Sequence, residues 1–192
     1  DLQNFSRDGM RRISRQGAGL EVRENGNIVQ VKTSSKDDMD LEIWIPKYFS
    51  LQLNVTHGDV TIDGVIGEHV IKATNGDVQM TNVGGAVVVN SANGDILVDL
   101  IEVYPDVPMS FTGLNGDLEV SLPSDTKFTA KMKTDYGDVF TNFDMQIDRS
   151  SKASESTESD GTYSVVVNKW ISGTINGGGP EYLFKTLHGD IE

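Results

Sequence analysis

Thr74-Asn75-Gly76-Asp77-Val78 is one of six copies of a motif in which His, Asn or Tyr is followed by Gly-Asp and then by an aliphatic residue. The other copies centre on the Gly-Asp pairs at 58–59, 94–95, 116–117, 137–138 and 189–190, and a degenerate copy begins at Asn25. The first five glycines are separated by 18, 18, 22 and 21 residues. A repeat of about 20 residues, with one turn and short strands in each, predicts stacked coils.

Apolar and polar residues alternate in the segment before each motif. Counting back from the residue that precedes Gly-Asp, the second, fourth and sixth positions are mostly apolar or small, and polar residues such as Gln52 lie between them. These positions hold Leu51, Leu53 and Val55; His69, Ile71 and Ala73; Val87, Val89 and Ser91; Met109, Phe111 and Gly113; Ala130, Met132 and Thr134; and Tyr182, Phe184 and Thr186. Alternation with a period of two is typical of a strand with one buried face. We therefore expect Ile71, Val89 and Phe111 to lie in the core.

Each turn is followed by further apolar residues. Val60 and Ile62 follow the first turn, later turns repeat this pair, and a third apolar contribution comes from Val65, Val83 and Ile101. Gly accepts a positive φ without steric cost, and Asp can accept hydrogen bonds from nearby amides, so the motif suits a tight corner. We predict an all-β fold, a parallel β-helix or β-solenoid with 18–22 residues per coil. Its coils should stack about 4.8 Å apart.

The N-terminal region has weaker repeats. We expect residues 1–19 to form an arm and residues 20–192 to form a single solenoid domain. Leu20–Val22, Ile28–Val31 and Leu41–Ile45 alternate like strands. A solenoid exposes unpaired edges at its ends, so these strands are predicted to cap the first coil.

The repeat is interrupted at about residues 141–180, which we interpret as an excursion from one coil. Asp148–Gly161 contains no large apolar residue and is expected to be an exposed loop. Tyr163–Trp170 is expected to be a strand and Ile171–Pro180 a turn, so that the excursion is a hairpin. The last Gly-Asp coil is then expected to close the stack.

The composition limits the classes of partner. The net charge of −13 argues against a nucleic-acid-binding protein, which needs a basic surface. No apolar run is long enough to span a bilayer, and cysteine is absent. Because the chain begins at Asp1 rather than Met, we expect that a leader has been removed. Five of the six arginines lie in the first 23 residues, which indicates a solvated arm or, alternatively, a contact with anionic lipid or a partner.

The motif predicts a ladder of carboxylates along one edge of the solenoid. Its members are Asp59, Asp77, Asp95, Asp117, Asp138 and Asp190. Two carboxylates about 4.8 Å apart repel each other by roughly 1 kcal/mol even in water. Either Ca²⁺ or the amides of the turns could offset this repulsion, and we favour the amides. We therefore assign no firm metal site.

No other chemical motif stands out. His57 and His188 occupy the turn position without a zinc-binding spacing, and we expect them at the surface. No nucleophile elbow, phosphate-binding loop or dinucleotide fingerprint occurs. The sequence therefore predicts no catalytic residue and no cofactor. The aromatic residues Trp44, Tyr48, Tyr163 and Trp170 could form a binding platform, although we expect the two tryptophans to cover the ends of the core.

The serial Gly-Asp turns, together with Ile45-Pro46, Leu122-Pro123 and the ending Gly173–Ile191, resemble the bacterial family labelled as adhesins. This is a domain of unknown function with β-helical repeats, and the resemblance covers roughly residues 20–192. It implies an exported or envelope-associated β-solenoid and no catalytic residue.

Three functions fit these expectations. The preferred one is a non-enzymatic adhesin or scaffold of the cell envelope, which binds an envelope protein or glycan. The alternatives are a carbohydrate-active β-helix enzyme and a sensor of divalent cations or envelope stress. A deep cleft with paired carboxyl groups would favour the enzyme.

Overall fold

The computed structural model describes residues 19–33, 39–148, 154–159, 162–167 and 170–192, with the backbone alone for 154–159 and 162–167. The chain divides into two compact units, Asp1–Trp44 and Ile45–Glu192. The second, here called the solenoid unit, contains every full copy of the Gly-Asp motif. The predicted arm falls almost entirely outside the described residues.

The first unit contains an antiparallel hairpin. Strand β1 (Leu20–Asn25) pairs with β2 (Ile28–Thr33), and Gly26 takes a φ of 64° in the turn between them. The prediction of a third strand at residues 41–45 is wrong, because this segment has an irregular backbone. Alternating apolar residues do not form a strand without a backbone partner, and Pro46 offers no N–H at the end of this segment. That the hairpin caps the solenoid stays a prediction.

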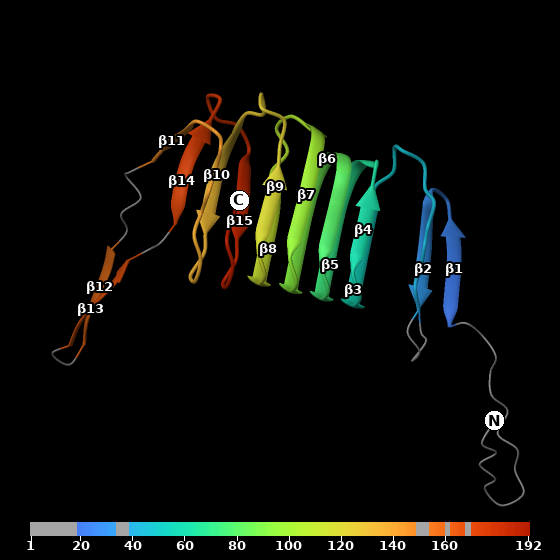
Figure 1. Ribbon diagram of the computed structural model, residues 1–192, viewed down its shortest axis with the longest axis horizontal. Helices are drawn as coiled ribbons and strands as arrows, with labels where there is room; N and C mark the ends of the chain where they lie inside the picture. The colour runs from blue at the N-terminus through green and yellow to red at the C-terminus, as the bar shows by residue number, and fades with distance from the viewer. Residues whose placement is uncertain (1–18, 34–38, 149–153, 160–161, 168–169) are drawn as a thin grey trace, which may run out of the picture. The chain divides into compact units, whose positions relative to one another are not determined.

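The first side of the solenoid is a parallel sheet. Its strands, in spatial order, are β3 (Leu51–His57), β5 (Ile66–Asn75), the second half of β6 (Val78–Asn93), β8 (Met109–Asn115), β15 (Glu181–Lys185) and β10 (Phe128–Lys133). Equivalent residues pair across it, so that Val89 lies between Ile71 and Phe111. The parallel β-solenoid is therefore confirmed (Figure 1).

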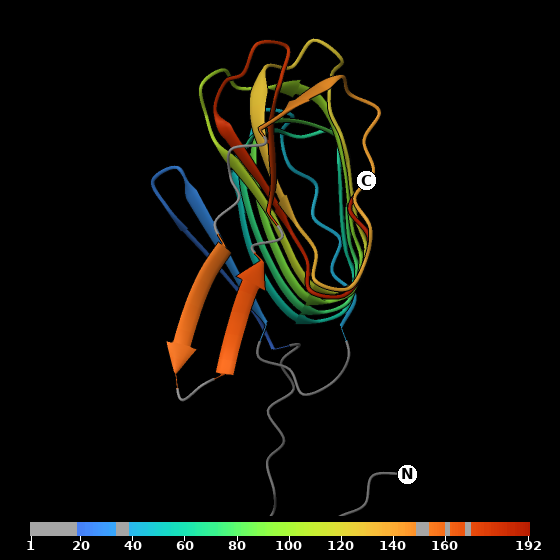
Figure 2. The ribbon, with the colours of Figure 1, turned by 90° about the vertical axis from the view of Figure 1, so that its left-hand side faces the viewer.

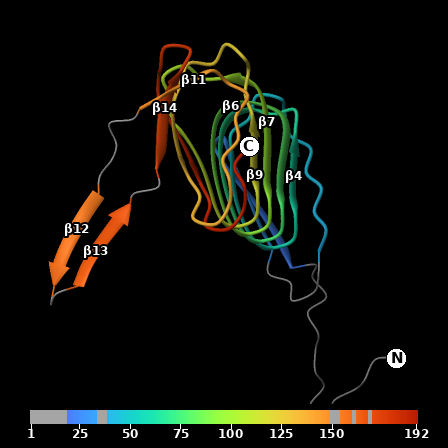
Figure 3. The ribbon, with the colours of Figure 1, turned by 60° about the vertical axis from the view of Figure 1, so that its left-hand side comes forward.

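The second side of the solenoid lies after the Gly-Asp turns. It is formed by β4 (Val60–Asp63), the first half of β6, β7 (Ile96–Val103) and β9 (Leu118–Ser121), which pair in parallel. Figures 2 and 3 show the strands of successive coils overlying one another around a common interior.

The third apolar contribution differs from the prediction by one residue. Leu100, not Ile101, pairs with Val83, and Ile101 is 50% exposed. The register between β6 and β7 shifts on either side of Val83: β6 has one extra residue between Met80 and Val83, and β7 has one, Ile101, between Leu100 and Glu102. Such a bulge moves the following side chain to the other face.

The last coil does not close the stack. Strand β15 lies between β8 and β10, so the C-terminal segment is inserted between two coils that are consecutive in the sequence. Figure 1 shows this strand, in red, between the yellow and amber ones. The expected order is wrong because each motif makes the same corner and pairs by the same backbone bonds, so any copy fits between any two others.

The excursion is partly built into the sheet. Strand β14 (Ile171–Ile175) pairs antiparallel with β10, and β11 (Met145–Ile147) pairs with β14. The prediction of a turn throughout Ile171–Pro180 is therefore wrong, because only the Asn176–Gly179 region turns. Strand β13 (Thr162–Val167) confirms the strand that was predicted to begin at Tyr163. It pairs with β12 (Ser154–Ser159), so the prediction of a loop throughout Asp148–Gly161 is wrong.

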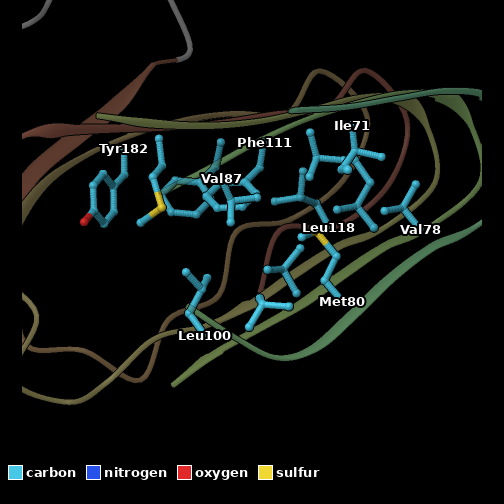
Figure 4. Close-up of a cluster of buried hydrophobic side chains, with 14 of the residues drawn as sticks. Ile71, Val78, Met80, Val87, Leu100, Phe111, Leu118 and Tyr182 are labelled. Atoms are coloured by element: carbon cyan, nitrogen blue, oxygen red, sulfur yellow. The ribbon is translucent and has the colours of Figure 1, made fainter. Parts of the chain in front are cut away.

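The core is a continuous column of inward side chains. Ile71, Val89 and Phe111 are 0% exposed, as the alternation predicts. Figure 4 shows Ile71 and Phe111 among the buried side chains of this column. Phe111 stacks on Phe184 with a centroid distance of 5.4 Å, and Phe128 stacks on Tyr182 at 4.7 Å. The buried aromatic residues of these pairs thus lie on β8, β15 and β10.

Candidate functional site

The six motif aspartates lie in one column at the corner between the two sides. Each carboxylate except that of Asp138, the last in the column, accepts a hydrogen bond from the backbone N–H of the aspartate in the next coil. These Oδ1 acceptors and N–H donors are Asp59 with Asp77 at 3.0 Å, Asp77 with Asp95 at 2.9 Å, and Asp95 with Asp117, Asp117 with Asp190 and Asp190 with Asp138 at 2.8 Å. The carboxylates therefore hold the coils in register.

This geometry bears on cation binding. One oxygen of each of the first five carboxylates in the column is already engaged by an amide. Within the described part of the chain, no group of three or more His, Cys, Asp or Glu residues is placed to hold a metal ion. Calcium binding by the ladder thus needs the remaining oxygens alone, and it stays a hypothesis to be tested.

A second ladder runs beside the aspartates. The amide of Asn93 donates to Asn75 at 3.0 Å, and that of Asn115 donates to Asn93 at 2.9 Å. The column ends in a stacked pair, since the rings of Tyr136 and His188 lie 4.7 Å apart and nearly parallel. Both rings are exposed, as is His57, so the histidines of the turns lie at the surface as predicted.

We expect Asp95→Asn to be nearly neutral in stability. Asn keeps an oxygen that can accept the N–H of Asp117, and the change relieves repulsion between neighbouring carboxylates. The midpoint of urea unfolding should shift little, whether chelator or excess Ca²⁺ is present.

The matched control is Asp99→Asn, which makes the same change on β7 outside the column. If the column binds calcium, saturating metal should stabilise the parent protein by about 2.7 kcal/mol at a hundredfold excess over Kd. A calcium-dependent rise in Tm that Asp95→Asn reduces and Asp99→Asn retains would establish the metal site and contradict our expectation.

His69 is the one histidine placed in the core. It is 1% exposed between Leu51 and Val87 of the adjacent coils, and neither ring nitrogen has a hydrogen bond of good geometry. Burial lowers the pKa of His69 from its ordinary value of 6.5, while backbone groups of Val65 and Gly84 partly oppose this shift. The sequence pattern assigned this position to the buried face but did not indicate the weak hydrogen bonding of the ring.

Because the unfolded chain binds a proton at His69 more readily, stability should fall as the pH drops below 6.5 and level off above it. The slope from one group is at most about 1.4 kcal/mol per pH unit. His69→Leu, which places the residue type of the preceding coil here, should remove this slope and stabilise the protein.

Urea titrations between about pH 5 and pH 7.5 would measure the slope, since most carboxyl groups titrate below this window. His57→Asn serves as the control because it removes an exposed histidine and introduces the residue of the neighbouring turns. An unchanged slope in His69→Leu would show that His69 is not the titrating group.

The predicted aromatic platform is not assembled as expected. Trp44 is 89% exposed and Tyr48 75% exposed, so Trp44 does not cover the core. Trp170 lies against the outward side chains of β10, with the Lys131 and Lys133 ammonium groups 5.2 and 5.9 Å from its ring centroid. The expectation that Trp170 covers a core end is therefore wrong as well. The side chain of Tyr163 lies outside the described residues.

The structure shows a pocket that the sequence did not predict. It has a volume of about 390 Å³ and lies between β9, the residues around Phe140–Phe143, and the inward faces of β10 and β14. Its walls are mainly aliphatic and aromatic. No motif marks it, because its lining residues come from segments that are far apart in the sequence.

Comparison with known proteins identifies one family. The model of the Toastrack DUF4097 family matches residues 46–177. No curated protein and no solved structure matches the chain. The described residues include no helix long and apolar enough to cross a membrane.

Proposed function

Because the chain belongs to the Toastrack DUF4097 family, a domain family without an assigned function, we propose that it is a non-enzymatic scaffold or adhesin of the cell envelope. In this role its outer β-sheet binds another envelope component, either a protein or a glycan. The solenoid acts as a rigid support, and the binding groups are the outward side chains of its strands.

The observation that supports this proposal most is a polar row across the first side of the solenoid. Outward residues at equivalent positions pair from coil to coil. In spatial order the row is Asn54, Lys72, Asn90, Thr112, Lys185 and Lys133. Such a row presents hydrogen-bonding groups at the regular spacing of neighbouring strands, about 4.8 Å. A flat polar array is suited to contacts with an extended partner and offers no enclosed site for chemistry.

The charge of the row also differs from that of the whole chain. Three lysines lie in it although the net charge is −13. An acidic protein that concentrates ammonium groups on one sheet is suited to a partner with complementary charge there, while the remainder of its surface repels other acidic molecules.

Affinity capture from a native envelope fraction tests the proposal. The immobilised chain should retain a specific envelope component. If the polar row contacts this component, Lys72→Glu should reduce the recovery of the component at least about tenfold. That factor corresponds to the loss of a charge pair worth about 1.4 kcal/mol. Lys127→Glu is the matched control because it makes the same change on an exposed loop outside the row.

Two results would contradict the proposal. One is equal capture by both variants and the parent, which would place binding elsewhere. The other is release of reducing ends from envelope polysaccharide by the purified chain, which would favour the carbohydrate-active alternative. Fractionation of native cells would test the envelope location separately.

A further inference from the structure

Several asparagines of the chain are followed directly by glycine, and this pair of residues can react with itself. The backbone nitrogen of the glycine can attack the side-chain amide carbon of the asparagine, because glycine has no Cβ to shield its nitrogen. The pairs begin at Asn25, Asn75, Asn93, Asn115 and Asn176. The fold places them in three different surroundings, so their reactivities should differ although their local sequences are alike.

Three of the pairs lie in the stacked turns, where hydrogen bonds hold both reacting groups. The N–H of each glycine donates to a backbone carbonyl of the coil on one side at 2.9–3.0 Å. The side-chain amide of each asparagine donates to the coil on the other side at 2.9–3.2 Å. These pairs are Asn75-Gly76, Asn93-Gly94 and Asn115-Gly116. The attack therefore requires that neighbouring coils first separate locally.

The pair Asn176-Gly177 is held at one of its two reacting groups. The side-chain amide of Asn176 donates to the carbonyl oxygens of Ser124 and Thr126 at 3.0 and 2.8 Å. Among the described residues, the N–H of Gly177 has no backbone acceptor. We therefore expect this pair to be intermediate in reactivity.

The pair Asn25-Gly26 is held at neither group. Asn25 is the last residue of β1 and pairs with Ile28 across the turn, and Asn25 and Gly26 are both exposed. A Cβ added at Gly26 would meet nothing within 4 Å, so the turn is open on that side. In the parts of the chain that the structure describes, neither the Asn25 amide nor the Gly26 N–H has a hydrogen-bond acceptor. The turn of a hairpin also opens more readily than stacked coils.

We propose that Asn25 is a site of spontaneous covalent modification, where the chain converts its own turn to an aspartyl or β-aspartyl linkage. The Gly26 nitrogen loses its proton to hydroxide and forms a bond to Cγ of Asn25. The bond from Cγ to Nδ2 breaks, and ammonia leaves after taking a proton from water. Water then adds to either carbonyl carbon of the cyclic imide and opens it. The net reaction consumes water and releases ammonia, without any oxidant or reductant.

The modification changes both the charge and the geometry of the hairpin. Either product places an additional carboxylate in the turn at neutral pH. The β-linked product also adds a methylene group to the backbone between residues 25 and 26. Because the turn sets the register of a hairpin, this longer backbone should loosen the pairing of Asn25 with Ile28. The site does not depend on the envelope role proposed above.

Incubation of the full chain at mildly alkaline pH tests the proposal. Peptide mass spectrometry follows the amide-to-acid conversion at every Asn-Gly pair, in the folded chain and in guanidinium chloride, and the ratio of the two rates removes differences in local sequence. At Asn25 the folded chain should react as fast as the unfolded chain, within about threefold. The pairs of the stacked turns should be slowed at least about tenfold, since each hydrogen bond that must open contributes on the order of fivefold.

Asn25→Gln should abolish the early conversion in the peptide that contains the turn, because the longer side chain would have to close a larger ring. Asn75→Gln is the matched control, since it makes the same change in the stacked turns and should leave the conversion at Asn25 intact. Protection of Asn25 by about tenfold or more in the folded chain would overturn the proposal. Conversion of the stacked pairs at their unfolded rates would overturn it as well. So would conversion that persists in this peptide of Asn25→Gln, because it would place the reaction at Asn27.

Discussion

Gly94→Ala should destabilise the protein by about 2–6 kcal/mol. Gly94 has a φ of 130°, which costs about 1–3 kcal/mol for a residue with a side chain. A Cβ at this position would lie 2.3 Å from the carbonyl oxygen of Gly76 in the adjacent coil. That oxygen belongs to the backbone and cannot rotate away, so the two coils must separate, at a further cost of about 1–3 kcal/mol.

Gly58→Ala is the matched control for this prediction. Gly58 occupies the same position in the first motif with a φ of 105°, but a Cβ there meets nothing within 4 Å. Its substitution should show the conformational cost alone. Denaturant titration of both variants would therefore separate backbone strain from coil stacking, and equal losses would show that the close approach of successive turns contributes nothing.

The same close approach explains why the sequence predicts the fold so well. Gly116 stacks on Gly94, and a Cβ at Gly189 would lie 2.1 Å from the carbonyl oxygen of Gly116. Each corner after the first thus requires Gly, each motif Asp before the last in the column accepts an amide from the next coil, and the inward residues follow with a period of two. These requirements are local, so they are visible in the sequence and predict the column of turns and the buried faces.

The order of the coils, by contrast, could not be predicted from these local requirements. Local turn chemistry is the same in every copy, so it does not distinguish a last coil from an inserted one. Two weak signals existed: Thr134 and Thr186 share the position before the turn, and Tyr136 and His188 both replace Asn. In the structure Thr134 Oγ1 donates to the Gly189 carbonyl at 2.9 Å, and the rings of Tyr136 and His188 stack.

The candidate sites differ in the same way, because one could be predicted from the sequence and the other could not. The aspartate column was predictable, because it follows from the repeat and from the stacking of equivalent residues. The pocket was not, because its lining residues are brought together only when β15 enters between β8 and β10. A sequence pattern indicates which residues point inward, but it does not show which segments they face.

The coil order also determines the surroundings of the largest buried side chains. Phe111 pairs with Phe184 in register because β15 lies next to β8, and the two rings are nearly parallel, with an angle of 16° between their planes. Without the insertion, Phe111 would face Met132 of β10. The aromatic pair therefore joins the C-terminal segment to the centre of the core.

Phe111→Ala should cost about 3–5 kcal/mol. Phe111 is 0% exposed, and its removal takes away the stacked partner of Phe184. The cavity would open beside the inserted strand, where the neighbouring inward residues come from different coils and cannot close together without moving the backbone.

Ser110→Ala is the matched control, because Ser110 precedes Phe111 on β8 and points to the outer face. Its effect on the urea midpoint should be within about 0.5 kcal/mol, as for most surface substitutions. A loss below about 1 kcal/mol in Phe111→Ala would show that the strand faces are inverted relative to the structure. A large loss in Phe111→Ala that is repeated in Phe184→Ala, but is not additive in the double variant, would establish that the two rings act as one unit across the insertion.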